Sequence, residues 1–339
     1  MKTVPIIHCV DHNYVLPAGV AFHSLLTHAR TPGMHYELHA IGSGLTDADK
    51  ELLNGIVSRF PNASVAFHEP PPLDLPVKRS HGNFSADMFY KMKIPEMFPG
   101  HDVALVSDVD VVYADDVAQL FEELHPDEDI YLCGTPDIGY SSWRGQGILR
   151  DTGAPKPFRR YERLMTEEER RKLLIGVGLF AMNLRLCRKD GMTERWFEFA
   201  RGNFKRLILP EQDVLNICCH PKIKAVSSRF MAIAGHEPEY RALSGQERAA
   251  NPAWDEMYAN PVQIHFASGI KPWKYPQCAC SRAWFEACLS AGLFDRWRTW
   301  YAYFTDPQMR TTFGRKLIDL HIPMGKSTIH IQCHREKRS

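Results

Sequence analysis

The chain has 339 residues, of which 44% are apolar and 24% are charged, and its formal net charge is +1. This is an ordinary globular composition, and a charge so close to zero gives no case for nucleic-acid binding. No stretch approaches the ~18 apolar residues of a membrane span, and the apolar start is too short for a secretory signal. The nine cysteines, an odd number, indicate reduced thiols rather than a disulfide framework. We therefore expect a cytoplasmic protein with one large α/β domain and a tail.

Basic charge is concentrated in that tail. From Arg296 onward the sequence has nine basic and three acidic residues, a net +6, which leaves −5 for the rest of the chain. The same segment contains five aromatic residues: Trp297, Trp300, Tyr301, Tyr303 and Phe304. The pattern predicts either peripheral contact with an anionic membrane or helices that cover a sheet and keep their charges in solvent. The sequence leaves both interpretations open.

Strand and helix patterns alternate through the first third of the chain. Short β-branched or apolar runs predict strands at Val4–Val10, Tyr36–Ile41, Ser64–His68 and Val103–Val106. Apolar spacing predicts intervening helices at Ala18–Ala29, 46–57 and Ser85–Met97. Thr46 caps the second of these helices, with Asp49 three residues later. Such a β-α-β alternation implies a parallel sheet with right-handed crossovers.

The second half of the chain is less regular. The patterns predict strands at Leu179–Met182 and Val262–Phe266, and helices at Val117–Leu124, Thr193–Ala200, Gln212–Cys218 and Trp284–Phe304. The stretch Ile138–Pro157 is rich in Gly and Pro, which predicts a loop over the site. The expected fold class is therefore α/β, with a mostly parallel, Rossmann-like sheet.

The strongest chemical signal is Asp108-Val109-Asp110, which follows the apolar run Leu105-Val106. Carboxylates at positions i and i+2 share a face of a strand, and at its carboxyl end both can turn toward one ion. Hard oxygen donors of this kind suit Mg²⁺ or Mn²⁺, which can bridge to phosphate oxygens. The alternative is that either residue only caps a turn, as Asp115 and Asp116 are expected to cap the following helix.

Three more polar groups stand at strand ends or at a helix start. His265 closes a strand and Lys271 follows six residues later, a spacing that can supply a metal ligand and a phosphate contact. A core-edge histidine and a solvated lysine are the alternative. Glu211-Gln212-Asp213 open a helix behind Pro210, which ordinary capping also explains. Asp11-His12-Asn13-Tyr14 follow the first strand, where an acid and a ring can hold a nucleotide base.

Taken in order, these residues resemble glycosyltransferase family 8, which includes bacterial lipooligosaccharide galactosyl- and glucosyltransferases and glycogenin. The resemblance extends from about Thr3 to Trp273 and includes the start Ile7–Tyr14. Asp108-Val109-Asp110 matches the family's DxD, Glu211-Gln212-Asp213 its DQD stretch, and His265–Trp273 its HxxGxxKPW stretch. Each motif alone is weak, but the ordered set is specific. The resemblance implies a GT-A catalytic domain at 1–275 and a helical, aromatic, basic extension at 276–339.

The resemblance also implies an activity and a role for each site residue. The activity is transfer of a hexose, galactose or glucose, from a UDP-sugar to a glycan or lipid-linked acceptor, with retention, in lipopolysaccharide or capsule synthesis. Asp108, Asp110 and His265 would hold Mn²⁺ or Mg²⁺. The UDP-sugar would contact Asp11, Asn13, Tyr14, Lys91, Asp108, Val109, Asp110, Gly269 and Lys271, with Tyr14 stacked on uracil. Glu211, Gln212 and Asp213 would line the sugar pocket as the candidate catalytic residues. Gln212 or Asp213 could face the anomeric carbon, and front-face and double-displacement routes both stay open.

Three positions depart from the family pattern, all on the sugar side. Gly176 replaces the Asn of the family's FNAGV stretch, Glu211 replaces Asp, and Lys91 replaces the usual Arg. These changes bear on which sugar is transferred more than on the chemistry.

Two rival functions and one further metal site fit the sequence less well. A nucleotidyl or phosphosugar transferase would need a glycine-rich basic loop, which His12-Asn13-Tyr14 does not provide. A non-catalytic sugar-nucleotide-binding protein would not need an intact set of Asp108, Asp110 and His265. Three cysteines, at Cys278, Cys280 and Cys288, suggest zinc but lack a second paired cluster.

Overall fold

The computed structural model describes residues 2–75, 80–81, 84–137, 175–207, 209–250, 252–267, 269–305, 318–324 and 327–333. The chain divides into two compact units, Met1–Ala291 and Gly292–Ser339. The expected loop at Ile138–Pro157 lies outside the described residues. Helix α14 (Ser281–Ser290) belongs to the first unit, where Ser290 Oγ lies 2.9 Å from His23 Nε2. A catalytic domain ending at residue 275 stays a prediction.

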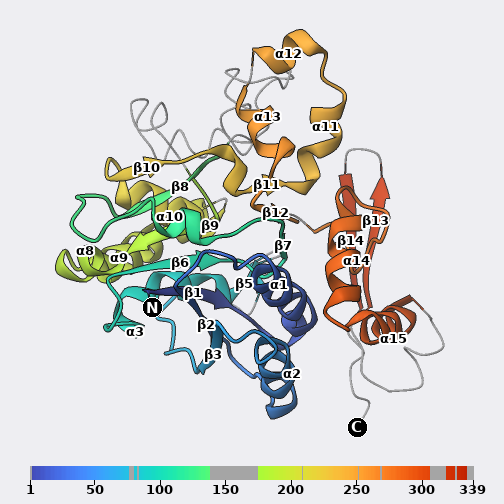
Figure 1. The fold of residues 1–339 in the computed structure, drawn as a ribbon, viewed down its shortest axis with the longest axis horizontal. Coiled ribbons are helices and arrows are strands. Elements are labelled where there is room, and N and C mark those ends of the chain that lie inside the picture. The colour runs from blue at the N-terminus through green and yellow to red at the C-terminus, as the bar shows by residue number, and fades with distance from the viewer. Residues whose placement is uncertain are drawn as a thin grey trace. The chain divides into compact units, whose positions relative to one another are not determined.

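The first unit is built on a seven-stranded sheet in the order β10-β8-β9-β6-β1-β2-β3 (Figure 1). The strands are β1 (Lys2–Cys9), β2 (Met34–Ile41), β3 (Ala63–His68), β6 (Val103–Ser107), β8 (Leu132–Pro136), β9 (Ile175–Asn183) and β10 (Ile223–Ala225). Neighbouring strands pair in parallel except β9, which is antiparallel to both β6 and β8. The predicted α/β fold is confirmed. Strand order reverses between β1 and β6, and ligands bind at such a point in open α/β sheets.

Helices cover both faces of this sheet. Along β2, Tyr36 and Leu38 pack into one apolar cluster with Phe22 of helix α1 (Val15–Thr27). The alternate residue Ile41 joins the opposite cluster, which contains Trp196 of helix α9 (Met192–Asn203). Because side chains alternate along a strand, a sheet buried on both faces needs apolar residues at both sets of positions. The sheet is therefore the middle of three layers.

A smaller sheet returns the chain to the strand ends. Its order is β11 (Ala232–Ile233), β12 (Gln263–His265) and β7 (Val111–Tyr113). Strand β12 pairs antiparallel with β7, so that His265 lies opposite Val111. This pairing brings two segments that are 150 residues apart in the sequence to one edge of the main sheet. The helices between β11 and β12 are α11 (Glu237–Arg241), α12 (Gly245–Ala249) and α13 (Pro252–Ala259).

The remaining elements of the first unit are mostly short. They are η1 (His12–Tyr14), α2 (Asp47–Val57), β4 (Ser80–His81), β5 (Phe84–Ser85), η2 (Ala86–Lys93), α3 (Ile94–Met97), α4 (Ala118–Phe121), α8 (Leu184–Lys189), η4 (Phe204–Arg206), α10 (Pro210–Cys219), η5 (Ser228–Phe230) and η6 (Ala234–His236). The predicted cap of α2 is confirmed, since Thr46 and Asp49 form a reciprocal capping box.

Two predicted helices are wrong in form. The segment at 85–97 is a 3₁₀-helix followed by the single α-turn α3. Pro95 lacks the amide that a continuous helix would need there and restricts the residue before it. The segment Trp284–Phe304 is two helices, α14 and α15 (Phe294–Thr305), because Gly292 between them has a left-handed φ of 75°.

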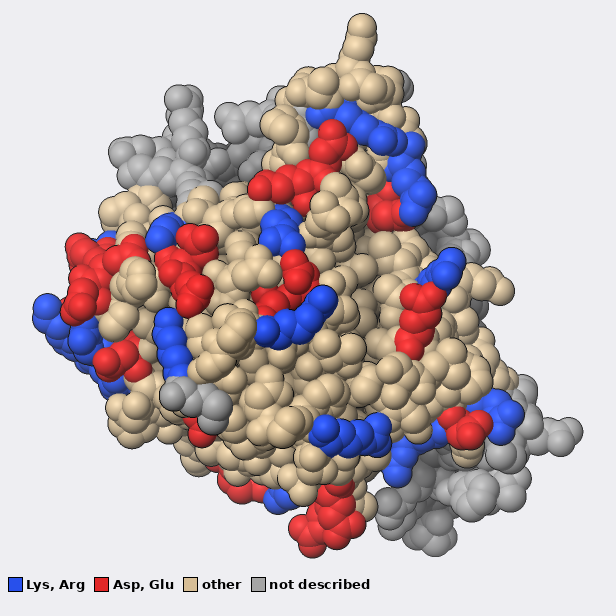
Figure 2. All heavy atoms as spheres, viewed as in Figure 1, with Lys and Arg blue, Asp and Glu red and all other residues tan. Residues whose placement is uncertain are grey.

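The second unit contains α15 and an antiparallel hairpin, β13 (Ile318–Met324) with β14 (Ser327–Cys333). The sequence predicted a helical extension in this part of the chain and did not predict the hairpin. In α15 the rings of Trp297 and Tyr301 stack at 5.2 Å, and those of Trp300 and Phe304 at 5.1 Å. No helix within the described ranges is long and apolar enough to cross a bilayer. Acidic and basic side chains are interspersed over the face that Figure 2 shows.

Candidate active site

The two aspartates of the DxD lie in the short link between β6 and β7. Strand β6 ends at Ser107, and the amide of Asp108 then donates to the Gly178 carbonyl of β9 at 3.0 Å. Val109 is buried beneath the link, and the Asp110 carbonyl accepts from the Phe266 amide at 2.9 Å. The backbone is thus held on both sides, so that the two carboxylates have defined positions at the carboxyl end of β6.

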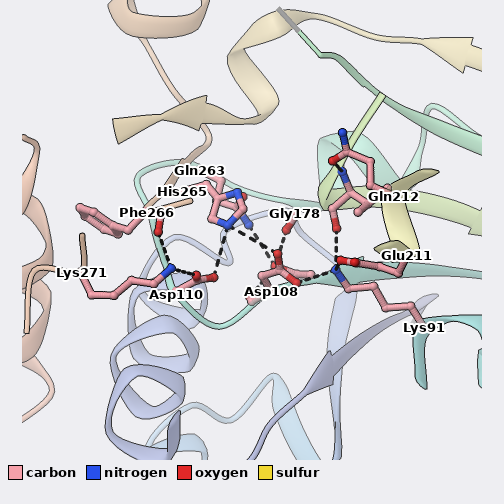
Figure 3. A network of polar contacts seen from close by, with 12 residues as sticks. Lys91, Asp108, Asp110, Gly178, Glu211, Gln212, Gln263, His265, Phe266 and Lys271 are labelled. Atoms are coloured by element: carbon pink, nitrogen blue, oxygen red, sulfur yellow. Dashed lines mark hydrogen bonds and ion pairs between the residues drawn. The ribbon is translucent and has the colours of Figure 1, made fainter. Parts of the chain in front are cut away.

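His265 completes a group of three potential metal ligands (Figure 3). Its Nε2 lies 3.5 Å from Asp108 Oδ2 and 3.3 Å from Asp110 Oδ1. One ligand atom from each residue falls within 4.8 Å of the other two. Ligands bound at about 2.0–2.2 Å to one ion, tetrahedral or octahedral, stand roughly 3.0–3.5 Å apart. Both measured separations agree with that range, so a divalent ion fits among these side chains.

A glycine on β9 makes room for this imidazole. A Cβ atom on Gly178 would lie 2.4 Å from His265 Nδ1, far inside the closest approach that carbon atoms make. Only a residue without a side chain can stand there while His265 faces the aspartates. The sequence gives no sign of this role for Gly178, because the contact joins residues 87 positions apart.

Two buried lysines form ion pairs with the carboxylates. Lys91 Nζ lies 2.6 Å from Asp108 Oδ1 and 3.3 Å from Glu211 Oε1, and it donates to the Val177 carbonyl at 3.0 Å. Lys271 Nζ pairs with Asp110 and donates to the Phe266 carbonyl at 2.6 Å. The structure therefore brings together six of the residues singled out in the sequence, His265 included, and each lysine lies beside a different aspartate (Figure 3).

These pairs shift the acidity of the buried groups. Burial opposes ionisation of Asp110, but Lys271 and His265 outweigh it and hold the pKa of that carboxyl well below its usual range. Burial likewise disfavours charge on Lys91, and the Asp108 and Glu211 carboxylates outweigh it and raise the pKa of the ammonium. For Glu211 burial prevails over the attraction of Lys91 and raises its pKa. Three acids and two lysines give the site a net charge of −1 when all are ionised, which favours a cation.

Helix α10 carries the three residues expected on the sugar side. Its first turn brings Glu211 to Lys91, as described above. Gln212 Nε2 donates to Asp137 Oδ2 at 2.7 Å, and the Gln212 side chain lies beside the network in Figure 3. Asp213 instead accepts from the backbone amide of Leu209 at 3.2 Å. Asp213 therefore acts in the structure as a cap of α10, the alternative that the sequence left open.

The expected nucleotide residues surround the end of β1. Asp11 caps η1 by accepting from the amides of Asn13, at 2.7 Å, and Tyr14, at 3.2 Å. The Tyr14 ring meets the Trp273 ring edge-on, with centroids 5.7 Å apart. Burial and the nearby Asp110 raise the pKa of Tyr14, so its hydroxyl stays protonated. Asn13, next to Tyr14 in the chain, and Gly269 are both exposed. The start of the chain and the Lys271–Trp273 segment thus meet in space.

A buried hydrogen bond that the sequence did not indicate holds the strand that carries His265. Gln263 is fully buried on β12, and its Nε2 donates to Ser107 Oγ at 3.0 Å. Ser107 Oγ is also 2.6 Å from the Tyr113 hydroxyl. These contacts join β12, β6 and β7, the strands next to the ligand group. The spacing of Gln263, two residues before His265 on one strand, was the available signal.

The cysteines at 278, 280 and 288 are free thiols. Within the described residues, they are not among the groups of side chains spaced to hold a metal ion. The zinc hint in the sequence therefore gains no support from these positions.

Solved structures share this fold at low sequence identity. The bifunctional glycosyltransferase WbbM superposes with a TM-score of 0.68 and 17% identity over 88% of this chain, which spans only 51% of the WbbM chain. The galactosyltransferase LgtC, solved in complex with donor and acceptor sugar analogs, gives a TM-score of 0.63 and 19% identity over 85% of this chain and 96% of its own. Mouse xyloside xylosyltransferase 1 gives 0.54 at 15% identity over 79% of this chain and 98% of its own. The fold is that of the GT-A glycosyltransferases.

The family follows from the sequence comparison. Residues 5–277 match the profile of glycosyl transferase family 8, and the chain belongs to that family. General stress protein A of Bacillus subtilis (strain 168) is 23% identical over 282 residues, 79% of this chain and 86% of that protein. The family resemblance is thereby confirmed, and the protein is a glycosyltransferase.

Proposed function

We propose that the chain is a metal-dependent, retaining hexosyltransferase that uses a UDP-sugar as donor and a glycan or lipid-linked hydroxyl as acceptor. The observation that carries this proposal is the group of Asp108, Asp110 and His265. It stands at the switch point of the sheet with a buried lysine on each side. Two carboxylates and one imidazole suit Mn²⁺ or Mg²⁺ in contact with phosphate. When bound, the ion supplies Lewis acidity that stabilises charge on the departing diphosphate.

The side chains around that group have separable tasks. Lys271 lies nine-tenths buried beside Asp110, within the segment that meets Tyr14, and its ammonium can donate to phosphate oxygens when a donor is present. Tyr14 and Trp273 provide an aromatic corner for the base. Asp11 holds Tyr14 in position by capping η1 and does not need to contact the base itself. Together these residues would orient the nucleotide with its diphosphate toward the aspartates.

The sugar side is formed by Lys91, Glu211 and Gln212. Lys91 joins Asp108 to Glu211, so a change at one of them alters the position of the others. Glu211 and Gln212 supply polar groups that can pair with sugar hydroxyls, and such sites discriminate strongly between epimers. Asp213 would contribute by fixing the first turn of α10. Because Asp213 is bonded to the Leu209 amide, Gln212 is our candidate to face the anomeric carbon, and both the front-face and double-displacement routes are compatible with it.

A donor screen tests this proposal. The full-length protein is incubated with UDP-galactose, UDP-glucose and other UDP-sugars, with Mn²⁺, Mg²⁺ or EDTA, and released UDP is measured. UDP-galactose comes first, because LgtC is a galactosyltransferase. We expect metal-dependent release from one preferred hexose donor and none from Asp110→Asn. Equal release with EDTA would contradict the metal role, and tight donor binding without any turnover would favour the non-catalytic alternative.

A further inference from the structure

A second group of metal-ligand side chains lies on β2, apart from the DxD. Glu37 and His39 are two residues apart and share one face of this strand, while His101 comes from the loop between α3 and β6. Glu37 Oε2 lies 3.6 Å from His39 Nε2 and 3.5 Å from His101 Nε2. All three ligand atoms are within 4.8 Å of one another. We refer to these three residues as the β2 cluster.

Two of the three ligand separations in the β2 cluster suit four-coordinate zinc. Zinc binds imidazole nitrogen and carboxylate oxygen at about 2.0–2.2 Å, and tetrahedral geometry then separates neighbouring ligand atoms by roughly 3.3–3.5 Å. The two distances to Glu37, 3.6 and 3.5 Å, lie close to this value. They are too long for direct hydrogen bonds. The three groups therefore lie close together without hydrogen-bonding to one another.

His39 carries the strongest indication of a ligand. Its side chain is only 6% exposed, and within the described residues its Nε2 has no hydrogen-bond partner. Its other nitrogen, Nδ1, lies 3.0 Å from Nε2 of His68 on β3. If Nδ1 carries the proton and donates it to His68, the Nε2 lone pair points at Glu37 and His101. A metal-binding histidine normally has its other ring nitrogen held in this way, which fixes its tautomer.

The surroundings suit binding of an ion from solvent. The Phe98 ring packs at 4.8 Å from His39 and 4.9 Å from His68, which keeps both imidazoles in place. Glu37 and His101 remain 32% and 25% exposed, so one side of the cluster is open to water. Burial and the neighbouring imidazoles lower the pKa of His39 to about 4, and the ring is therefore neutral at neutral pH.

We propose that Glu37, His39 and His101 form a zinc site that is separate from the catalytic metal group and leaves one position for water or an exogenous ligand. Two imidazoles and one carboxylate favour zinc, whereas the DxD group, with two carboxylates, favours harder ions such as Mn²⁺. The site joins β2, which lies next to the edge strand β3, to the loop that leads into β6, the strand that directly precedes Asp108. Bound zinc would therefore stabilise the sheet on which the active site is built.

Zinc titration of the full-length, metal-stripped protein tests this site. The parent for the test is Asp108→Asn/Asp110→Asn, in which the catalytic ligands are disabled. We expect this parent to bind one equivalent of Zn²⁺ by calorimetry and to melt at a higher temperature with Zn²⁺ than without it. Adding His101→Ala, at a partly exposed loop position, should weaken Zn²⁺ binding by more than about tenfold and abolish the thermal shift.

Two further variants keep the test decisive. His35 lies on the same face of β2, but its Nε2 is paired with Ser64 Oγ at 2.9 Å, so His35→Ala in the same parent should leave Zn²⁺ binding unchanged. Glu37→Gln keeps the shape of the side chain and replaces His101→Ala if that variant does not fold by circular dichroism. The site is overturned if the parent binds no zinc, or if His101→Ala and Glu37→Gln bind it as the parent does.

Discussion

Replacing Gly178 with alanine should disable the metal group without removing any of its ligands. The new Cβ would stand 2.4 Å from His265 Nδ1 and 2.6 Å from its Cε1, against a limit of 3.0 Å for real Cβ contacts. The ring must therefore move by 0.6 Å or more, the difference between 3.0 and 2.4 Å. Metal–ligand distances tolerate about 0.2 Å, so His265 would no longer share an ion with Asp108 and Asp110. Loss of one such electrostatic contact should lower kcat by about 10²–10³-fold, or roughly 3–4 kcal/mol.

Gly176, two residues earlier on β9, is the matched control. A Cβ there would lie 2.2 Å from Met231 Cε, but this methyl is the far end of a flexible side chain that can turn aside. Gly176→Ala should therefore keep its Mn²⁺ affinity far better than Gly178→Ala, although both substitutions add the same atom to the same buried strand. The assay is UDP release over a range of Mn²⁺ concentrations with the preferred donor. Thermal melting checks that the overpacking cost, about 1–3 kcal/mol, leaves each variant folded.

The expected signature is a large loss of Mn²⁺ affinity in Gly178→Ala and little change in Gly176→Ala. A folded Gly178→Ala enzyme with wild-type kcat and wild-type Mn²⁺ dependence would refute the reasoning. Such a result would mean that His265 either moves without consequence or holds no ion.

The other predictions address separate parts of the site and the tail. Asp110→Ala should abolish turnover, a loss of several kcal/mol, yet retain the fold by circular dichroism, and near-normal activity would remove it from the metal group. Tyr14→Ala should raise the KM for the donor more than it lowers kcat, because stacking acts in both ground and transition states, and unchanged UDP affinity by calorimetry would place the base elsewhere. Lys91→Arg and Glu211→Asp, separately and together, should change the ratio of kcat/KM between UDP-galactose and UDP-glucose, and an unchanged ratio would assign donor choice to another wall. If the basic tail binds anionic membranes, the full chain should co-sediment with anionic liposomes at low salt and release at high salt, while a chain ending at Leu293 should not bind; equal, negligible binding by both would leave the tail purely structural.

Local sequence patterns determined much of the main sheet. Apolar runs identified β1, β2, β3 and β6, and the Thr46 capping box identified the start of α2, because these signals depend on residues within one turn or one strand. The ordered motifs also indicated the family. Each motif lies directly at the end of a strand or the start of a helix, where a local pattern can locate it. Local patterns predicted one continuous helix in two places where the structure has two shorter ones. The breaks lie next to Pro95, which lacks an amide hydrogen, and at Gly292, which has a positive φ.

Tertiary structure alone decided how those motifs meet. Nothing near Asp108 in the sequence indicates that β12 returns antiparallel to β7, or that Gly178 must lack a side chain for His265 to reach the aspartates. The same is true of Glu37, His39 and His101, whose ligand atoms converge because a strand and a distant loop lie side by side. Sequence periodicity reports which face of an element a residue occupies, whereas contacts between elements depend on strand order and packing, which no local pattern encodes.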